Sequence, residues 1–123
     1  TIVAAGSMVG RSMQAAQELE KEGIQARVVE MHTIKPLDRE ILLEAIKETG
    51  ALVTAEEHVR IGGLGSAVAE YAAETLPVPI EIVGIPDTFC PTGRNIDGLL
   101  DACGLSVAEI VAAARRAFAR KTG

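Results

Sequence analysis

The stretch ALVTAEEHVRIGGLGSAV (residues 51–68) decides the fold that we expect for this chain. It opens with a mainly apolar run at residues 51–56, which is typical of a strand buried on both faces of a parallel sheet. Three glycines follow, and residues 67–76 then show the pattern of a helix. A strand that passes through a glycine-rich turn into a helix is the repeating unit of parallel α/β folds.

The same alternation of strand and helix extends over the whole chain. Apolar runs predict three further strands, at residues 1–6, 26–31 and 80–85. Helical spacing predicts four further helices, at residues 8–22, 39–48, 96–103 and from about 106 to 119. Asp38 is the expected N-cap of the second of these, and SVAE (106–109) has the Ser-x-x-Glu form of a capping box at the start of the last. This order predicts parallel strands, right-handed crossovers and helices on both faces, which is a three-layer α/β/α sandwich. With 123 residues, the chain is expected to form a single domain over residues 1–123.

Composition and charge argue against two classes of partner. The net charge is −5, and the lysines and arginines form no stripe with interleaved aromatics, so we expect no binding to nucleic acid. No apolar run reaches the roughly 20 residues that a membrane-spanning helix needs. The two cysteines, Cys90 and Cys103, do not form a Cys-x-x-Cys pair. We therefore expect two reduced thiols and a cytoplasmic protein.

The three glycines of the opening stretch allow two interpretations. GLGSAV (63–68) matches half of the dinucleotide-binding fingerprint G-x-G-x-x-G, but Val68 stands in place of its third glycine. The alternative is structural: Gly62, Gly63 and Gly65 permit positive φ and a close approach of helix and strand. We favour the structural interpretation and expect no cofactor-binding residue here.

Three charged or polar residues end the strand of the opening stretch. Glu56, Glu57 and His58 lie where open α/β sheets bind their ligands, at the carboxyl end of a buried strand. They are either solvated loop residues, with one carboxylate capping the amides of the next helix, or functional contacts. His32 follows the second predicted strand, but a metal site would need a third ligand besides His32 and His58, so no metal site is predicted.

Three stretches together resemble a known family. They are VVEMHTIKPLD (28–38), TAEEHVRIGGLGSAVAE (54–70) and GIPDTFCPTGR (84–94), and the opening TIVAAGSMV (1–9) is compatible with the same domain. Together they resemble the C-terminal domain of transketolase-type thiamin diphosphate enzymes. The resemblance is greatest to the C-terminal subunit of split transketolases. The same domain in 1-deoxy-D-xylulose 5-phosphate synthase and in the β subunit of 2-oxoacid dehydrogenases is a near neighbour.

The resemblance implies a role outside the chemistry of the parent enzyme. In this family thiamin diphosphate and Mg²⁺ are bound by two other domains, whose Gly-Asp-Gly and Asn-Asn signature is not in this sequence. No catalytic, cofactor-binding or metal-binding residue is therefore expected, and the isolated chain is expected to be inactive. The parent reaction would be the transfer of a two-carbon ketol unit between sugar phosphates. The family also implies a sheet of four, with a possible fifth strand, in the order 2-1-3-4.

The expected partners are the thiamin-binding domains or subunit of the same enzyme, within a homo-oligomer such as a dimer, and we expect this chain to be part of a longer one. The candidate site, which we call the contact loop, serves as a domain contact or as an anion-binding site. It would share a crevice with residues 6–10. It consists of Glu57, His58, Gly62, Gly63, Gly65 and Ser66. An alternative from another class is a non-catalytic anion-binding or interaction module.

Overall fold

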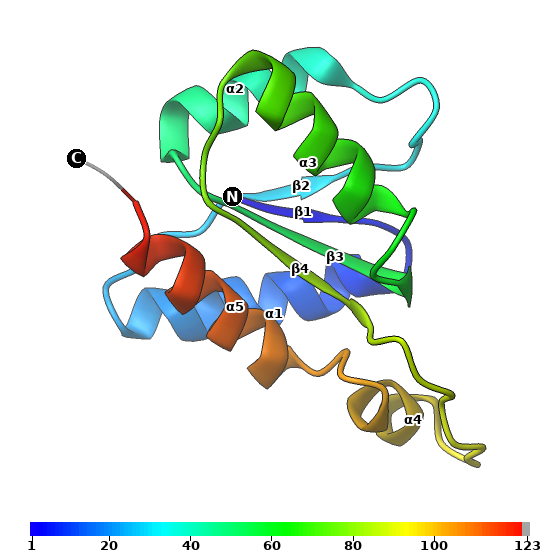
Figure 1. The fold of residues 1–123 in the computed structure, drawn as a ribbon. Helices are drawn as coiled ribbons and strands as arrows, with labels where there is room; N and C mark the ends of the chain where they lie inside the picture. Colours follow the sequence, from blue (N-terminus) through cyan, green and yellow to red (C-terminus); the bar gives the residue numbers. More distant parts are fainter. Residues whose placement is uncertain (122–123) are drawn as a thin grey trace.

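The computed structural model describes residues 1–121 and contains nine regular elements (Figure 1). The strands are β1 (Ile2–Ala4), β2 (Val28–Glu30), β3 (Leu52–Val59) and β4 (Ile80–Ile85). The helices are α1 (Met8–Lys21), α2 (Arg39–Thr49), α3 (Leu64–Thr75), α4 (Ile96–Ala102) and α5 (Val107–Ala119). Every predicted strand and helix is present, in the predicted order.

The four strands form one parallel sheet in the order β2-β1-β3-β4, as predicted. Val3 in the central strand β1 lies opposite Val29 of β2 on one side and Thr54 of β3 on the other. The chain first extends the sheet from β1 to β2 and then returns to the other side of β1 to place β3. The point where the order reverses therefore lies between β1 and β3, where open sheets form a crevice.

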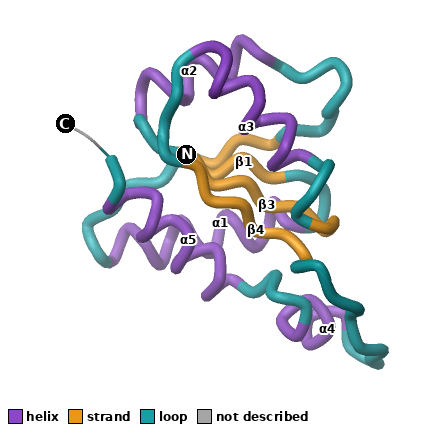
Figure 2. Tube along the Cα trace, in the orientation of Figure 1, coloured by secondary structure: helices purple, strands orange, loops and turns teal. Residues whose placement is uncertain are grey.

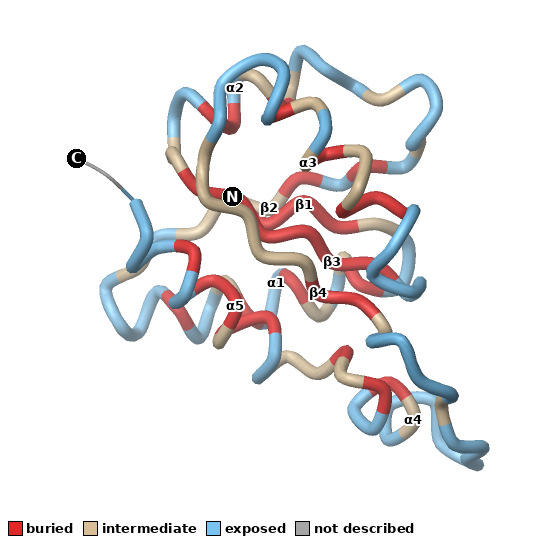
Figure 3. The backbone as a smooth tube through the Cα atoms, in the orientation of Figure 1, coloured by how far each residue is buried: buried red, intermediate tan, exposed pale blue. Residues whose placement is uncertain are grey.

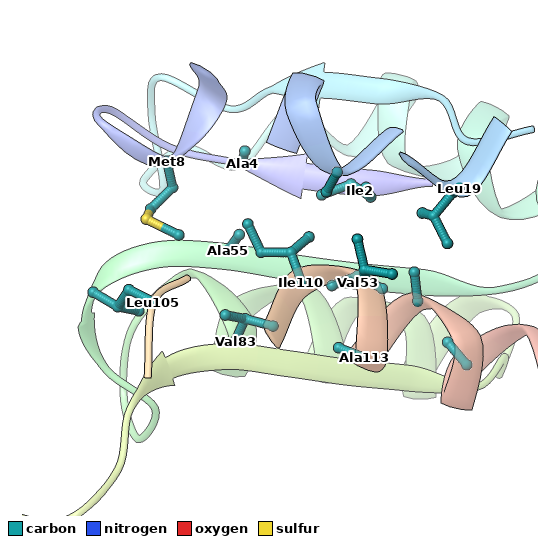
Figure 4. Packing of buried hydrophobic residues seen from close by; sticks show 14 of the residues in the cluster. Ile2, Ala4, Met8, Leu19, Val53, Ala55, Val83, Leu105, Ile110 and Ala113 are labelled. Atoms are coloured by element: carbon teal, nitrogen blue, oxygen red, sulfur yellow. The ribbon is translucent and has the colours of Figure 1, made fainter. Parts of the chain in front are cut away.

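Helices cover both faces of the sheet, which confirms the three-layer sandwich. Helices α1 and α5 lie on one face and α2 and α3 on the other (Figures 1 and 2). Successive residues of a strand point to opposite faces. Ile2 and Ala4 accordingly pack with Met8 and Ile110 under α1 and α5 (Figure 4), whereas Val3 packs under α2 and α3.

Local signals at the helix ends agree with the structure. The side chain of Asp38 accepts a hydrogen bond from the backbone nitrogen of Ile41 and caps α2, which ends at Gly50 in the left-handed region with φ 68°. Ser106 caps α5 by accepting from the nitrogen of Glu109, as the capping-box pattern predicted. No helix in the described part of the chain is both long and apolar enough to cross a membrane.

The junction between β3 and α3 differs from the prediction. Strand β3 continues to Val59, so Glu57 and His58 belong to the strand and not to a loop. The reason is pairing with β4: Val59 lies opposite Ile85, and the nitrogen of Arg60 donates to the carbonyl oxygen of Ile85. Helix α3 starts at residue 64 instead of 67, so Gly65 and Ser66 belong to the helix.

Residues 86–104, which we call the α4 arm, extend away from the sandwich (Figures 1 and 3). The arm folds back on itself and brings Cys90 beside Cys103, with their Cα atoms 5.6 Å apart, and the two form a disulfide. The prediction of two reduced thiols is wrong in this structure, because the sequence does not show that two cysteines 13 positions apart meet after folding. The cytoplasmic location expected from those thiols loses that support.

Candidate functional site

The last residues of β3 point alternately to the two faces of the sheet. A β-carbon placed on Gly63, at the start of α3, would lie 2.1 Å from Oε1 of Glu56 and 2.8 Å from Nδ1 of His58. The hydroxyl of Ser7, before α1, donates to Oε2 of Glu57 over 2.6 Å. Glu56 and His58 therefore face α3 and Glu57 faces α1, as the two-residue period of a strand requires.

The bond between Ser7 and Glu57 spans the crevice at the switch point. Residues 6–10 come from the end of β1 and Glu57 comes from the end of β3, so the two segments predicted to flank one crevice do so. Ser7 occupies the N-cap position of α1, yet its side chain makes no capping bond there. Its hydroxyl is directed to the neighbouring strand instead, and both residues remain exposed on the surface.

Glu56 is the residue of this region that sequence reasoning left out of the contact loop. Its side chain is buried, with 5% of the residue exposed, and its Oε1 accepts from the backbone nitrogen of Gly65 over 3.4 Å. A carboxylate at a helix N-terminus satisfies an unpaired amide and interacts favourably with the helix dipole. The expected capping carboxylate is thus Glu56, and the expectation that it is solvated is wrong. The available signal was register, because Glu56 lies on the same strand face as buried Leu52 and Thr54.

The three glycines play different roles. Gly62 has φ +82°, so the prediction of a positive φ is correct there. It is wrong for Gly63, which has φ −101°, and for Gly65, which lies inside α3. Close packing is the reason for both: a β-carbon on Gly65 would lie 2.6 Å from Cγ2 of Ile82 and 2.9 Å from Oγ1 of Thr54. Positions 63 and 65 need glycine because the start of α3 packs in direct contact with side chains of β3 and β4.

Ser66 and His58 complete the contact loop. The backbone nitrogen of Gly62 donates to the hydroxyl oxygen of Ser66 over 2.8 Å, which closes the turn onto the first turn of α3. Nδ1 of His58 lies 2.7 Å from the carbonyl oxygen of Val59. Since a carbonyl only accepts, Nδ1 is the donor in this contact, and the rest of the ring is exposed.

The residues of this site do not fit thiamin diphosphate with Mg²⁺. The start of α3, where a diphosphate would meet backbone amides, already holds the negative carboxylate of Glu56. In residues 1–121, no three His, Cys, Asp or Glu side chains form a group that could hold a metal ion. His32 follows β2 and His58 lies in β3, and β1 separates these two strands. Nδ1 of His32 lies 2.6 Å from Oγ1 of its neighbour Thr33. The geometry is that of a packed junction with an exposed rim.

Residues 1–110 match the model of the transketolase C-terminal domain, and the chain belongs to this family. One relative, "6-deoxy-6-sulfo-D-fructose transketolase subunit SqwH" of Clostridium sp. (strain MSTE9), is 47% identical over 121 residues, which cover 98% of this chain and 37% of the relative. An apulose-4-phosphate transketolase subunit of Phocaeicola vulgatus is 52% identical over 77% of this chain and 30% of its own length. The 1-deoxy-D-xylulose-5-phosphate synthase of Heliobacterium modesticaldum is 42% identical over 94% of this chain and 18% of its own.

A solved structure agrees with these relatives. It is described as "Split gene transketolase, inactive beta4 tetramer", and it matches with a TM-score of 0.89 and 49% identity over 98% of this chain and 38% of its own. The resemblance read from the sequence is therefore confirmed, including its preference for the subunits of split transketolases. The chain spans about a third of the length of the first two relatives.

Proposed function

We propose that this chain is the C-terminal domain of a transketolase-like enzyme that transfers a two-carbon ketol unit between sugar phosphates. Two of the relatives named above are described as transketolase subunits, and they are 47% and 52% identical to this chain. In this proposal residues 1–123 form one domain, which serves assembly and domain contacts. Thiamin diphosphate and Mg²⁺ are bound by other domains of the parent enzyme.

One observation carries the assignment to assembly instead of chemistry. The carboxylate of Glu56 fills the space at the start of α3 that an anionic cofactor or substrate would need, and it is buried there. An anion would have to displace a like charge from the helix N-terminus, which is unfavourable. The contact loop is therefore suited to contacts with neighbouring domains and not to the binding of an anion.

The exposed side of the contact loop is the proposed contact with the thiamin-binding domains or subunit. Glu57 is held by Ser7, and His58 is oriented by Val59, so both side chains are positioned before a partner arrives. Side chains that are already ordered lose less conformational entropy when an interface forms. His58 would then present its exposed ring to the neighbouring domain.

We also propose that the chain forms part of a homo-oligomer. The solved relative that is 49% identical is described as a β4 tetramer. The similarity is high over nearly the whole chain, which supports self-association here. A cytoplasmic location would suit an enzyme acting on sugar phosphates and stays a prediction.

Titration calorimetry tests the cofactor part of the proposal. The 123-residue chain, titrated with thiamin diphosphate and Mg²⁺, should give no specific heat of binding, and the chain alone should be inactive. Titration with inorganic phosphate tests the alternative of an anion-binding module in the same instrument. Micromolar binding of thiamin diphosphate would overturn the assignment of the cofactor to other domains.

Replacing His58 tests the contact loop. His58→Ala should leave the free energy of unfolding of the chain within about 0.5 kcal/mol, because the side chain is exposed, but should weaken association with the thiamin-binding partner. His32→Ala is the matched control, since His32 is the chain's other histidine and is also exposed. If His58→Ala unfolds the chain, or if both variants associate equally well, the contact role is refuted.

The synthase alternative has its own support in a relative that is 42% identical over 94% of this chain. Reconstitution of this chain with its partner domains separates the two reactions. The complete enzyme should be assayed for ketol transfer between sugar phosphates and for formation of deoxyxylulose phosphate. Activity in only the second assay would replace the transketolase proposal with the synthase.

A further inference from the structure

Three large apolar side chains of the β3–α3 junction and the α4 arm are exposed. Phe89 is fully exposed at 101%, and Ile61 and Ile96 are 76% and 75% exposed. The chain has only two phenylalanines and no tryptophan, so Phe89 is one of its largest apolar side chains, and it is exposed to solvent. Exposed apolar side chains next to an apolar groove are typical of an interaction site.

A groove lies next to these projecting side chains. It has a volume of about 690 Å³, and its apolar lining includes Val59, Ile61, Ile82 and Ile85. Pro86 and Asp87, the first residues of the α4 arm, form another part of its lining, and Phe89 follows two residues later. The exposed Phe89 is therefore only two residues away from the lining of an apolar groove.

Both signs of charge line the same groove. Arg60 and Asp87 are exposed, and among the described residues neither takes part in an ion pair. An interface between two identical chains around a two-fold axis must be complementary to itself, because each residue meets a different residue of the same patch. The groove has one positive and one negative group in its lining, so each of two copies would offer the other a partner for both charges. The ring of Phe89, two residues after Asp87, would fill the apolar part of the other copy's groove.

The α4 arm is held in position from two sides. The disulfide joins Cys90, directly after Phe89, to Cys103 at the end of α4. Arg11 of α1 donates to Asp97 and to Asp101, and it also reaches the carbonyl oxygen of Leu105 over 3.1 Å. A restrained arm loses less freedom when Phe89 docks, which favours association.

We propose that a second copy of this chain occupies the groove, with Phe89 of each copy inserted into the groove of the other and Arg60 facing the partner's Asp87. This inference rests on the homo-oligomer of the proposed function, and it assigns the groove and Phe89 as the interface between the two copies. The thiamin-binding domains are the competing occupant. The self-complementary charges favour the second copy, because nothing requires a different partner to mirror them.

A tryptophan probe tests the insertion of Phe89. The chain contains no tryptophan, so the variant F89W carries a single indole, and F118W is the matched control at the other phenylalanine, 49% exposed on α5. Sedimentation should show dimers at high concentration. The emission of F89W should shift to shorter wavelength as dimers form, whereas the emission of F118W should stay constant. An F89W dimer whose indole remains solvated overturns the assigned surface and leaves the homo-oligomer standing.

Charge reversal tests the pairing of Arg60 with Asp87. R60E and D87R should each raise the dimer dissociation constant at least about tenfold, and the double variant should recover most of the affinity, which a folding defect would not do. Absence of recovery overturns the proposed pairing. A chain that is monomeric throughout overturns both this inference and the homo-oligomer, while the cofactor and activity tests of the proposed function keep their own outcomes. Shielding of F89W only after addition of the thiamin-binding partner assigns the groove to that partner and overturns the second copy.

Discussion

The carboxylate of Glu56 fills the space that a side chain on Gly63 would require. A β-carbon at Gly63 would lie 2.1 Å from Oε1 of Glu56, and real β-carbons do not approach an oxygen so closely. Glu56 in turn accepts from the nitrogen of Gly65 and is almost fully buried. The end of β3 and the start of α3 therefore pack tightly against each other. This packing of Glu56 against Gly63 supports the exposed part of the contact loop.

Adding a methyl group to Gly63 should destabilise the domain. We expect Gly63→Ala to lower the free energy of unfolding by about 1–3 kcal/mol, because Glu56 has to leave its place at the start of α3. Gly10→Ala is the control: Gly10 lies in α1, and a β-carbon there meets nothing within 4 Å, so this variant should gain about 0.5–1 kcal/mol. Urea denaturation of both variants measures the difference. Equal stability of Gly63→Ala and the parent chain would show that the junction is looser than the structure indicates.

Replacing Thr54 by valine should not destabilise the core. Thr54 is fully buried in β3, and among the described residues its Oγ1 has no hydrogen-bond partner. Exchange of this hydroxyl for a methyl group removes a buried unpaired group, and we expect a gain of about 1 kcal/mol. Thr49→Val is the control and should lose about 1 kcal/mol, because the hydroxyl of Thr49 donates to the carbonyl oxygen of Ala45 over 2.9 Å. A clear loss in Thr54→Val would mean that a buried water satisfies the hydroxyl.

Reduction of the disulfide should loosen the α4 arm. Cys90 and Cys103 are 13 residues apart, and closing a loop of that length stabilises a chain by about 3 kcal/mol in the chain-entropy model. Thermal unfolding with and without a reducing agent measures the loss, and the double variant Cys90→Ser, Cys103→Ser should not respond to the reductant. A thiol count on unfolded, non-reduced protein should find no free thiol. Recovery of both thiols would restore the expectation drawn from the sequence.

The elements that depend on local pattern could be predicted from the amino-acid sequence. Apolar runs located all four strands, and the caps Asp38 and Ser106 located the starts of α2 and α5, because these signals act between residues close in the chain. The strand order 2-1-3-4 came with the family resemblance, which three separated motifs carried. Crossover handedness and the burial of both sheet faces follow from the alternation of strand and helix.

Which residues of the central junction are buried depends on contacts between distant segments of the chain. Strand β3 runs on to Val59 because β4 pairs with it there, from 26 positions further along the chain at Ile85. In this longer strand Glu56 faces α3 and Glu57 faces Ser7. Glu56 is therefore buried and caps the helix, whereas Glu57 is exposed and accepts from Ser7. The disulfide between the ends of the α4 arm depends in the same way on chain segments that meet only after folding. No local pattern encodes such contacts, since their energy depends on a partner that the neighbouring sequence does not contain.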